Sequence, residues 1–318
     1  MEGQWKQWKQ WLAPILVLVV ALTLSYTAQR VHTSTFEDPK LLEHGMKTPT
    51  IWLYYDDSEV NSRWWSDFGA RSSRVLNLPF LNLCYASIVK AAGSNYHVEV
   101  ISGIADAAQK LGGWDKLPYN MRNKKIPIGP EELTYLRVAF LEQFGGLWIN
   151  PATICIAPLP EFSKESVVFF GSDPTETYSG SQLPNQNVVW SPVPHHPVFQ
   201  DWRKNLNERL TKMAGGTNIR NDKNWDLVFV SSGRKDVVRY SDLELTRKKN
   251  GRKIELEDLL ATGGDLTFPI PANTLFVPFP WPEVLQRRMF GWFLRMSEQQ
   301  IMESDIAVKY VFERAGVQ

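Results

Sequence analysis

Beyond residue 48 the sequence alternates short apolar runs with longer segments in which apolar residues recur every three or four positions. Such alternation is typical of strands and amphipathic helices that follow each other along a chain. Strands are predicted at 51–55, 96–101, 147–149, 167–171, 187–191 and 227–231, and helices at 81–91, 104–111, 130–144 and after Pro197. This order predicts an α/β domain with a mainly parallel sheet and helices on its faces.

The clearest pattern is a helix, a Gly-Gly turn and a strand within residues 129–149. Leu133, Leu136, Phe140 and Phe144 fall on one helical stripe, and Gly145-Gly146 supplies the left-handed residue that ends such a helix. The apolar run that follows predicts a short buried strand.

Three other segments carry weaker patterns. A long polar loop is predicted from residue 173 to residue 186, and an apolar helix from Pro282 through Met296. Ser297 and Gln300 have the spacing of a capping box, which predicts the start of another helix.

One charged residue interrupts the stripe of the helix at 130–144. Arg137 stands four residues after Leu133 and three before Phe140, so its guanidinium points toward the apolar side. A guanidinium in that position needs a carboxylate, a carbonyl or a phosphate. The sequence leaves two alternatives open, a structural ion pair and a place near a bound phosphate.

These residues resemble a known family. Arg137 followed at the family's spacing by Gly145-Gly146, a short strand and a polar break is similar to the core of GT-A glycosyltransferases, in the group related to yeast mannosyltransferases and capsular polysaccharide synthesis proteins. The resemblance implies a GT-A-like nucleotide-diphospho-sugar transferase fold. It also implies that Arg137, Gly146 and Asn150 bind the substrate.

The sequence departs from the family pattern at two places. Thr134 stands where the family has an aspartate three residues before the arginine, and Asn150-Pro151-Ala152 stands where it has the D-x-D that holds a divalent metal. Both departures remove the carboxylate oxygen that Mg²⁺ or Mn²⁺ requires at a diphosphate. We therefore expect a nucleotide-sugar donor but no metal site.

Further site residues follow from the predicted strand ends and from the resemblance. Tyr55, Asp56 and Asp57 end the first strand, where doubly wound sheets place their ligands, although the two aspartates can equally form a turn. Arg71 can meet a phosphate or lie in a surface loop. His196 matches a His-Pro of the family, with a helix cap as the alternative.

Asp173 follows the strand at 167–171 and is the predicted catalytic base, with Asp56 as a second carboxylate for this role. A general base must be a group that can take up a proton. The amide of Asn150 therefore cannot serve.

Nearly the whole chain after residue 48 also resembles unassigned glycosyltransferase-like proteins of large DNA viruses. The shared features are an arginine and serine cluster around Arg71, the Gly-Gly strand without aspartates, and a closing segment from Met296 to Asp305. This resemblance implies that the loss of D-x-D is a trait of a subgroup.

The N-terminal region carries the features of a membrane anchor. No charged residue occurs from Trp11 to Ala28, and Trp11 and Tyr26 flank the apolar run as interfacial residues do. We predict a cytosolic tail at 1–10, a transmembrane signal-anchor at 11–28, a stem at 29–48 and the GT-A-like domain at 49–318. A cleaved signal peptide is the alternative, but no clean cleavage site comes after the apolar run.

The distribution of lysine and arginine around the predicted span favours a large domain outside the cytosol. Lys6 and Lys9 precede the predicted span, whereas Arg30 and Lys40 come after it, and Lys40 lies beside Glu37 and Asp38. This bias favours a single-pass type II protein of the secretory pathway, in Golgi or ER, or of a viral membrane.

Composition excludes several function classes. The 318 residues carry a net charge of +1, which gives no reason to expect a nucleic-acid partner. The two cysteines form neither a disulfide framework nor a metal motif. The sequence contains no P-loop, no G-x-S-x-G elbow, no H-E-x-x-H and no dinucleotide fingerprint.

The sequence thus predicts a membrane-anchored glycosyltransferase-like protein that transfers a sugar from a nucleotide sugar to a glycan or protein acceptor. The alternative is a catalytically inactive GT-A-like domain that binds a glycan or a protein at a membrane. The losses at Thr134 and Asn150-Pro151-Ala152 motivate it.

Overall fold

The computed structural model describes residues 48–56, 78–122, 128–178, 181–214, 234–240, 242–263 and 268–317. The chain divides into two compact units, Met1–Thr48 and Pro49–Gln318, and the described helices and strands all belong to the second. Across the described ranges, no helix combines the length and the apolarity that a membrane crossing needs. The predicted span at 11–28 and the predicted strand at 227–231 lie outside them.

The second unit is built on a mixed sheet with the strand order β2-β1-β3-β8-β5-β9. Its strands are β1 (Thr50–Tyr55), β2 (His97–Ser102), β3 (Gly146–Ile149), β5 (Val167–Phe170), β8 (Val188–Ser191) and β9 (Val237–Tyr240). β8 runs antiparallel to β3 and β5, whereas the other neighbouring pairs are parallel. The predicted mainly parallel sheet is therefore confirmed.

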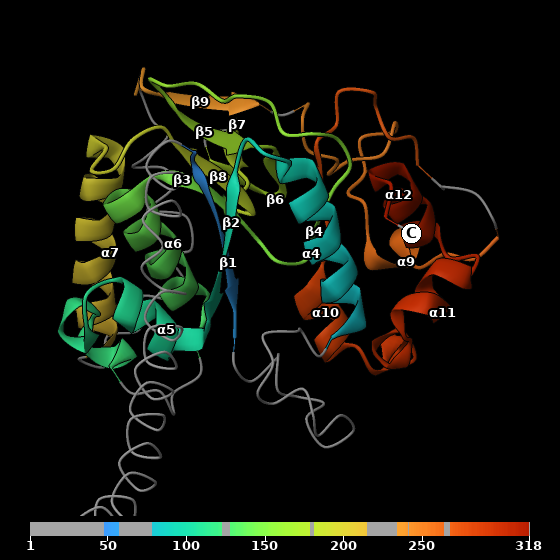
Figure 1. Cartoon of the computed structure of the whole chain (residues 1–318), viewed down its shortest axis with the longest axis horizontal. Helices are drawn as coiled ribbons and strands as arrows, with labels where there is room; N and C mark the ends of the chain where they lie inside the picture. The colour runs from blue at the N-terminus through green and yellow to red at the C-terminus, as the bar shows by residue number, and fades with distance from the viewer. Residues whose placement is uncertain are drawn as a thin grey trace, which may run out of the picture. The chain divides into compact units, whose positions relative to one another are not determined.

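Helices cover both faces of this sheet, as predicted (Figure 1). Side chains of β1 alternate between the faces. Ile51, Leu53 and Tyr55 join the core beneath α4 (Pro79–Ala92). Trp52 and Tyr54 join the core on the other face. The helices of that other face are α5 (Gly103–Lys110), α6 (Pro130–Phe144) and α7 (Pro197–Ala214).

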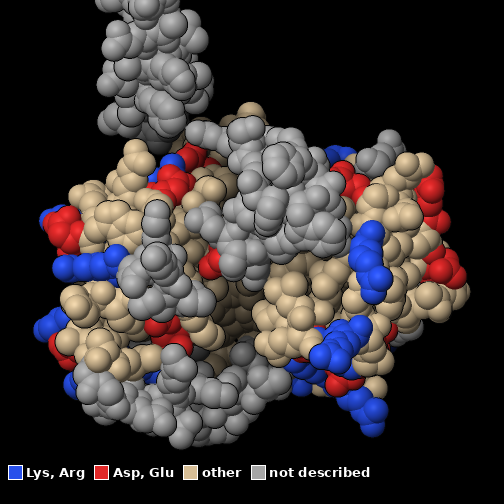
Figure 2. Space-filling model, turned by 90° about the horizontal axis from the view of Figure 1, so that it is seen from below, with Lys and Arg blue, Asp and Glu red and all other residues tan. Residues whose placement is uncertain are grey.

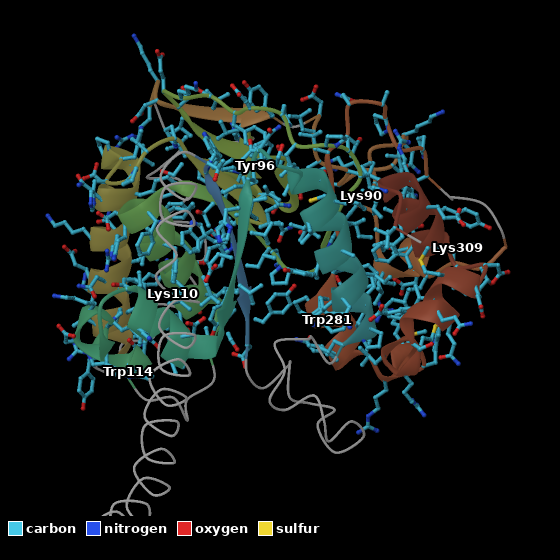
Figure 3. The ribbon with its side chains drawn as sticks, viewed as in Figure 1. Lys90, Tyr96, Lys110, Trp114, Trp281 and Lys309 are labelled. Atoms are coloured by element: carbon cyan, nitrogen blue, oxygen red, sulfur yellow. The ribbon has the colours of Figure 1, made fainter. Side chains whose placement is uncertain are left out.

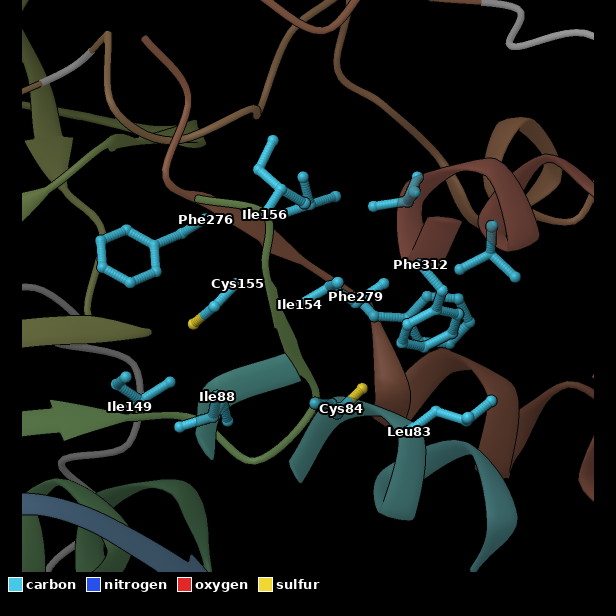
Figure 4. Close-up of a cluster of buried hydrophobic side chains, with 14 of the residues drawn as sticks. Leu83, Cys84, Ile88, Ile149, Ile154, Cys155, Ile156, Phe276, Phe279 and Phe312 are labelled. Atoms are coloured by element: carbon cyan, nitrogen blue, oxygen red, sulfur yellow. The ribbon is translucent and has the colours of Figure 1, made fainter. Parts of the chain in front are cut away.

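The C-terminal part packs on the α4 side. Here β4 (Thr153–Cys155) pairs with β10 (Phe276–Pro278), and the short helices are α9 (Leu256–Leu259), α10 (Trp281–Gln286), α11 (Glu298–Glu303) and α12 (Ala307–Ala315). Figure 4 shows the cluster between these elements and α4, in which Cys84 and Cys155 are buried free thiols. Lys90, at the end of α4 in Figure 3, donates to the carbonyl of Gly316 (2.5 Å), which ties α4 to the end of α12.

The predicted helix from Pro282 to Met296 is wrong in its length. α10 ends at Gln286, and two 3-10 turns come next, η4 (Arg288–Phe290) and η5 (Phe293–Arg295). Phe290 and Phe293 are buried while Met289 and Trp292 are exposed, so both sets recur at a spacing of three. That spacing suits a 3-10 turn, whose side chains eclipse every third residue.

The capping box is confirmed, because the side chains of Ser297 and Gln300 each accept from the other residue's backbone N–H. The predicted polar loop at 173–186 is wrong in part. The hairpin strands β6 (Ser172–Tyr178) and β7 (Ser181–Pro184) occupy most of this range.

Candidate functional site

The site predicted from the sequence lies at the carboxyl edge of the sheet. β1, β2 and β3 are parallel, so all three end at this edge, with Tyr55 opposite Ser102. Asp56 follows β1 and Asn150 follows β3. Figure 2 shows the molecule from this side, and the surface is hollowed near its middle. Ligands of doubly wound sheets bind at this place.

Asn150 forms the turn that leaves β3. Its Oδ1 accepts from the backbone N–H of Ala152 (3.1 Å), and its Nδ2 donates to Oδ1 of Asn187 (3.4 Å). Its backbone N–H donates to the carbonyl of Asn187 (2.7 Å). The side chain is therefore held by its own turn and by the residue before β8.

Arg137 is a buried cation with a neutral partner. Its side chain leaves α6 toward the sheet, the residue is 7 % exposed, and Nη1 donates to Oε1 of Gln186. The guanidinium carbon lies 6.0 Å from the centroid of the Trp148 ring. Within the described ranges Nε has no hydrogen-bond partner, and no carboxylate pairs with the guanidinium. Burial lowers the pKa of Arg137 to about 9.

This environment answers one question left by the sequence. The structural ion pair is not observed among the described residues, and the partner is the amide oxygen of Gln186. A buried positive charge without a counter-ion favours the approach of an anion.

Gln186 and Asn187 join the predicted residues into one polar cluster. Gln186 contacts Arg137, and the Thr134 hydroxyl lies 3.5 Å from its Oε1, while Asn187 contacts Asn150. We call Thr134, Arg137, Asn150, Gln186 and Asn187 the edge cluster. Sequence reasoning missed Gln186 and Asn187, since nothing in their polar surroundings distinguishes them from other residues that precede a strand.

The remaining predicted residues near this edge differ in what the structure shows. Tyr55 is 2 % exposed and packs on the α4 side, where burial raises the pKa of its phenol. Asp56 is partly exposed directly after β1. Asp173 lies in β6, where the backbone alone is described. Asp57 and Arg71 lie outside the described residues.

The structure does not bring Gly146 and His196 to the edge cluster. Gly146 begins β3 at the amino edge, with φ 92°, and a Cβ on it would meet the carbonyl oxygen of Thr50 at 2.3 Å. His196 precedes α7, and its Nδ1 accepts from the backbone N–H of Val198 (3.3 Å), as a helix cap does. Burial lowers the pKa of His196.

The turn after β3 does not fit a divalent metal. It offers no carboxylate at Asn150-Pro151-Ala152, and the one side-chain oxygen of this tripeptide already accepts a hydrogen bond. Among the described residues, histidine, cysteine and acidic side chains nowhere gather in a group that could hold a metal ion.

Comparison with known proteins finds few similarities. No family model matches the sequence, and no curated protein matches it. Among solved structures, the chain is similar to glycosyltransferase GlyE of Streptococcus pneumoniae TIGR4, with 9 % identity and a TM-score of 0.34 over 62 % of this chain and 46 % of that chain. The apo form gives 8 % identity and a TM-score of 0.39 over 85 % and 60 %.

Both matches span less than two thirds of the streptococcal chain. A likeness at this level assigns no activity. The resemblances to yeast mannosyltransferases and to viral proteins stay predictions.

Proposed function

We propose that residues 49–318 form a GT-A-like domain that binds a nucleotide sugar at the carboxyl edge of the sheet and transfers the sugar to a glycan or protein acceptor. The observation that carries the proposal is the buried guanidinium of Arg137, which has an amide oxygen as its partner and lies beside the turn at Asn150. A nucleotide diphosphate supplies the negative charge that this group lacks.

Arg137 acts in this scheme by stabilising the leaving group. Negative charge develops on the diphosphate as the bond to the sugar breaks, and a fixed cation in a site of low dielectric stabilises that charge strongly. The turn at Asn150 does not fit a metal, so this role falls to side chains and helix ends.

The amino end of α4 is a second favourable feature at the same edge. The helix begins at Pro79 without a side-chain cap and without an acidic residue in its first turn, so its first N–H groups and its dipole can meet a phosphate. α6 differs, because Glu131 and Glu132 occupy its first turn. We therefore place the diphosphate between α4 and Arg137.

The acceptor hydroxyl must lose a proton during transfer. Asp56 and Asp173 are the carboxylates we assign to this step, since each follows a strand that ends at the carboxyl edge.

Calorimetric titration of the full chain in detergent with UDP-glucose and GDP-mannose tests the proposal. We expect one of the two to bind in the presence of a chelator, and manganese to leave its affinity unchanged. Binding that requires manganese would refute our account of the turn at Asn150. Absence of binding at millimolar donor would refute the nucleotide-sugar site.

A second candidate is a catalytically inactive GT-A-like module that binds a glycan or a protein. One observation favours it: both polar atoms of the Asn150 side chain are engaged within the protein. Release of nucleotide from the bound donor separates the two, because a transferase releases it faster when acceptor is added and an inactive module releases none.

We further propose that residues 11–28 anchor the chain as a single-pass type II protein of the secretory pathway or of a viral membrane. Extraction of expressing cells with alkaline carbonate tests the anchor, since an integral protein stays in the pellet. Protease protection of a tag at the C-terminus tests the orientation. A tag that is digested in intact vesicles would reverse it.

A further inference from the structure

A cavity of about 570 Å³ lies outside the edge cluster, between α6, α7 and two 3-10 turns, η2 (Trp114–Lys116) and η3 (Tyr119–Met121). Its volume is in the range of ligand pockets. No residue of the edge cluster lines it, and nearly all the side chains that do are polar or charged.

The rim of this cavity is fixed to its floor. Arg122 donates from Nε to the carbonyl of Leu117 (2.9 Å) and from Nη2 to the carbonyl of Asp115 (3.0 Å), which holds the two 3-10 turns together. The Tyr135 hydroxyl of α6 donates to the carbonyl of Lys116 (3.3 Å). These hydrogen bonds join η2, η3 and α6 at one side of the cavity.

The floor carries an ion pair whose charges are balanced. Arg203 donates from Nη1 to Oε2 of Glu142 (2.6 Å), and its guanidinium carbon lies 5.7 Å from the centroid of the Tyr135 ring. Nδ1 of His195 lies 2.7 Å from the other oxygen of Glu142. The floor therefore adds hydrogen-bonding groups but no net negative charge.

The rim, in contrast, is positive. Lys116, Arg122 and Lys204 are exposed residues that line the cavity, and the acid beside them is Asp115, which lies 3.6 Å from Lys116. Within the described ranges neither Arg122 nor Lys204 pairs with a carboxylate. An anionic ligand therefore meets cations at the opening.

The rim also presents an aromatic ring to solvent. Tyr119 lines the cavity and is 81 % exposed. Trp114, labelled in Figure 3, belongs to the same segment and does not line the cavity. Gln200, Asn207 and Thr211 add groups that can both donate and accept hydrogen bonds. Sugar hydroxyls also donate and accept, and the C–H face of a sugar ring is apolar enough to pack on an exposed aromatic face.

We propose that this cavity binds an acidic saccharide, with a sugar ring against Tyr119, its hydroxyls on the side chains of α7, and its anionic group between Lys116, Arg122 and Lys204. The site goes beyond the proposed transfer reaction, because it needs no nucleotide and shares no residue with the edge cluster.

The test is calorimetric titration of the full chain with tetragalacturonate and, as a matched ligand, its fully methyl-esterified form. We expect tetragalacturonate to bind about tenfold more tightly than the ester, and its affinity to fall as the salt concentration rises. Equal binding of the two ligands would overturn the assignment to an acidic saccharide. So would sulfate that displaces the acid at equal concentration, since it would indicate a simple anion site.

Substitutions of exposed residues test whether the saccharide binds in this cavity. Lys116→Gln and Lys204→Gln should each lower the affinity for tetragalacturonate about threefold and leave the affinity for the ester unchanged. Tyr119→Ala should lower the affinity for both ligands. Lys249→Gln, an exposed lysine of the hairpin at 247–253, is the matched control and should change neither. Variants that bind like the parent would overturn the proposal. Displacement of the saccharide by UDP-glucose would overturn its independence from the transfer site.

Discussion

Gly146, which begins β3, and Asn150, which follows it, lie four residues apart but differ in what surrounds them. At the amino end Gly146 packs directly beneath the carbonyl oxygen of Thr50, and the Trp52 indole donates to the carbonyl of Gly145 (2.9 Å). At the carboxyl end Asn150 leads into a polar cluster that includes the buried guanidinium of Arg137. Close packing explains why a glycine is needed at the amino end. It does not explain why a buried positive charge lies near the carboxyl end.

The largest loss of stability is expected from Gly146→Ala. The left-handed backbone and the overlap with a backbone oxygen should together lower the free energy of unfolding by about 2–4 kcal/mol. Urea denaturation followed by circular dichroism measures the change.

Gly251→Ala is the matched control for this substitution. Gly251 has φ 77°, and a Cβ there would meet nothing within 4 Å. The Gly251→Ala substitution should lower the free energy of unfolding by about 1 kcal/mol, because it introduces backbone strain alone. Equal losses at both positions would show that the close approach to Thr50 is not what requires glycine at Gly146.

A smaller loss is expected from Arg203→Met, which removes the carboxylate-paired cation of α7. Glu142 would keep its contact with Nδ1 of His195 and lose the 2.6 Å contact with Arg203. Since both side chains retain some exposure to solvent, we expect a loss of about 1–2 kcal/mol, less than for a fully buried pair. Thermal and urea denaturation measure it, and an unchanged midpoint would contradict the role given to this pair.

Arg137→Met should behave differently from Arg203→Met. Methionine removes a buried charge whose partner is a neutral amide, so we expect a change in stability within about 1 kcal/mol and of either sign. The same variant should weaken donor binding by roughly 10–100-fold, because a charge-assisted hydrogen bond to the diphosphate is lost.

Arg137→Lys separates charge from geometry in this experiment. It keeps the positive charge but not the planar fork, and should recover part of the binding. If Arg137→Met unfolds the domain while donor binding per folded molecule is unchanged, Arg137 is structural and the comparison between the ends of β3 fails.

The sequence predicted the elements with long apolar patterns. The predicted apolar stripe marked α6, and the glycine pair marked its end, as the structure confirms. Phe144, the last member of that stripe, is nevertheless 37 % exposed. The direction of β8 was not predictable, because a short apolar run such as Val188-Val189-Trp190 has the same pattern in a parallel and in an antiparallel strand. β4 and β10 have three residues each, too few for a periodic signal.

The candidate site was predictable in part. Arg137 stood out because a charge interrupted an apolar stripe. Asn150 was proposed because it stands in the place of the D-x-D of the family that the sequence resembles. Gln186 could not be found this way, since its role depends on a hairpin that brings it to α6. The cavity between α6 and α7 combines residues of several elements that are far apart in sequence, and no local pattern marks it.

The smallest expected effect lies at the amino edge and concerns pH. Burial lowers the pKa of His196 in the folded protein, whereas the unfolded chain titrates near about 6.5. Below that value the unfolded state binds more protons than the folded state, so stability falls as pH decreases through about 6.5 toward the folded pKa.

His196→Gln should therefore reduce the loss of stability between pH 7 and pH 5, measured by urea midpoints at each pH. A steeper slope in His196→Gln would mean that the folded protein stabilises the charged imidazole, and the amino edge would then hold a charge of its own, as the carboxyl edge does.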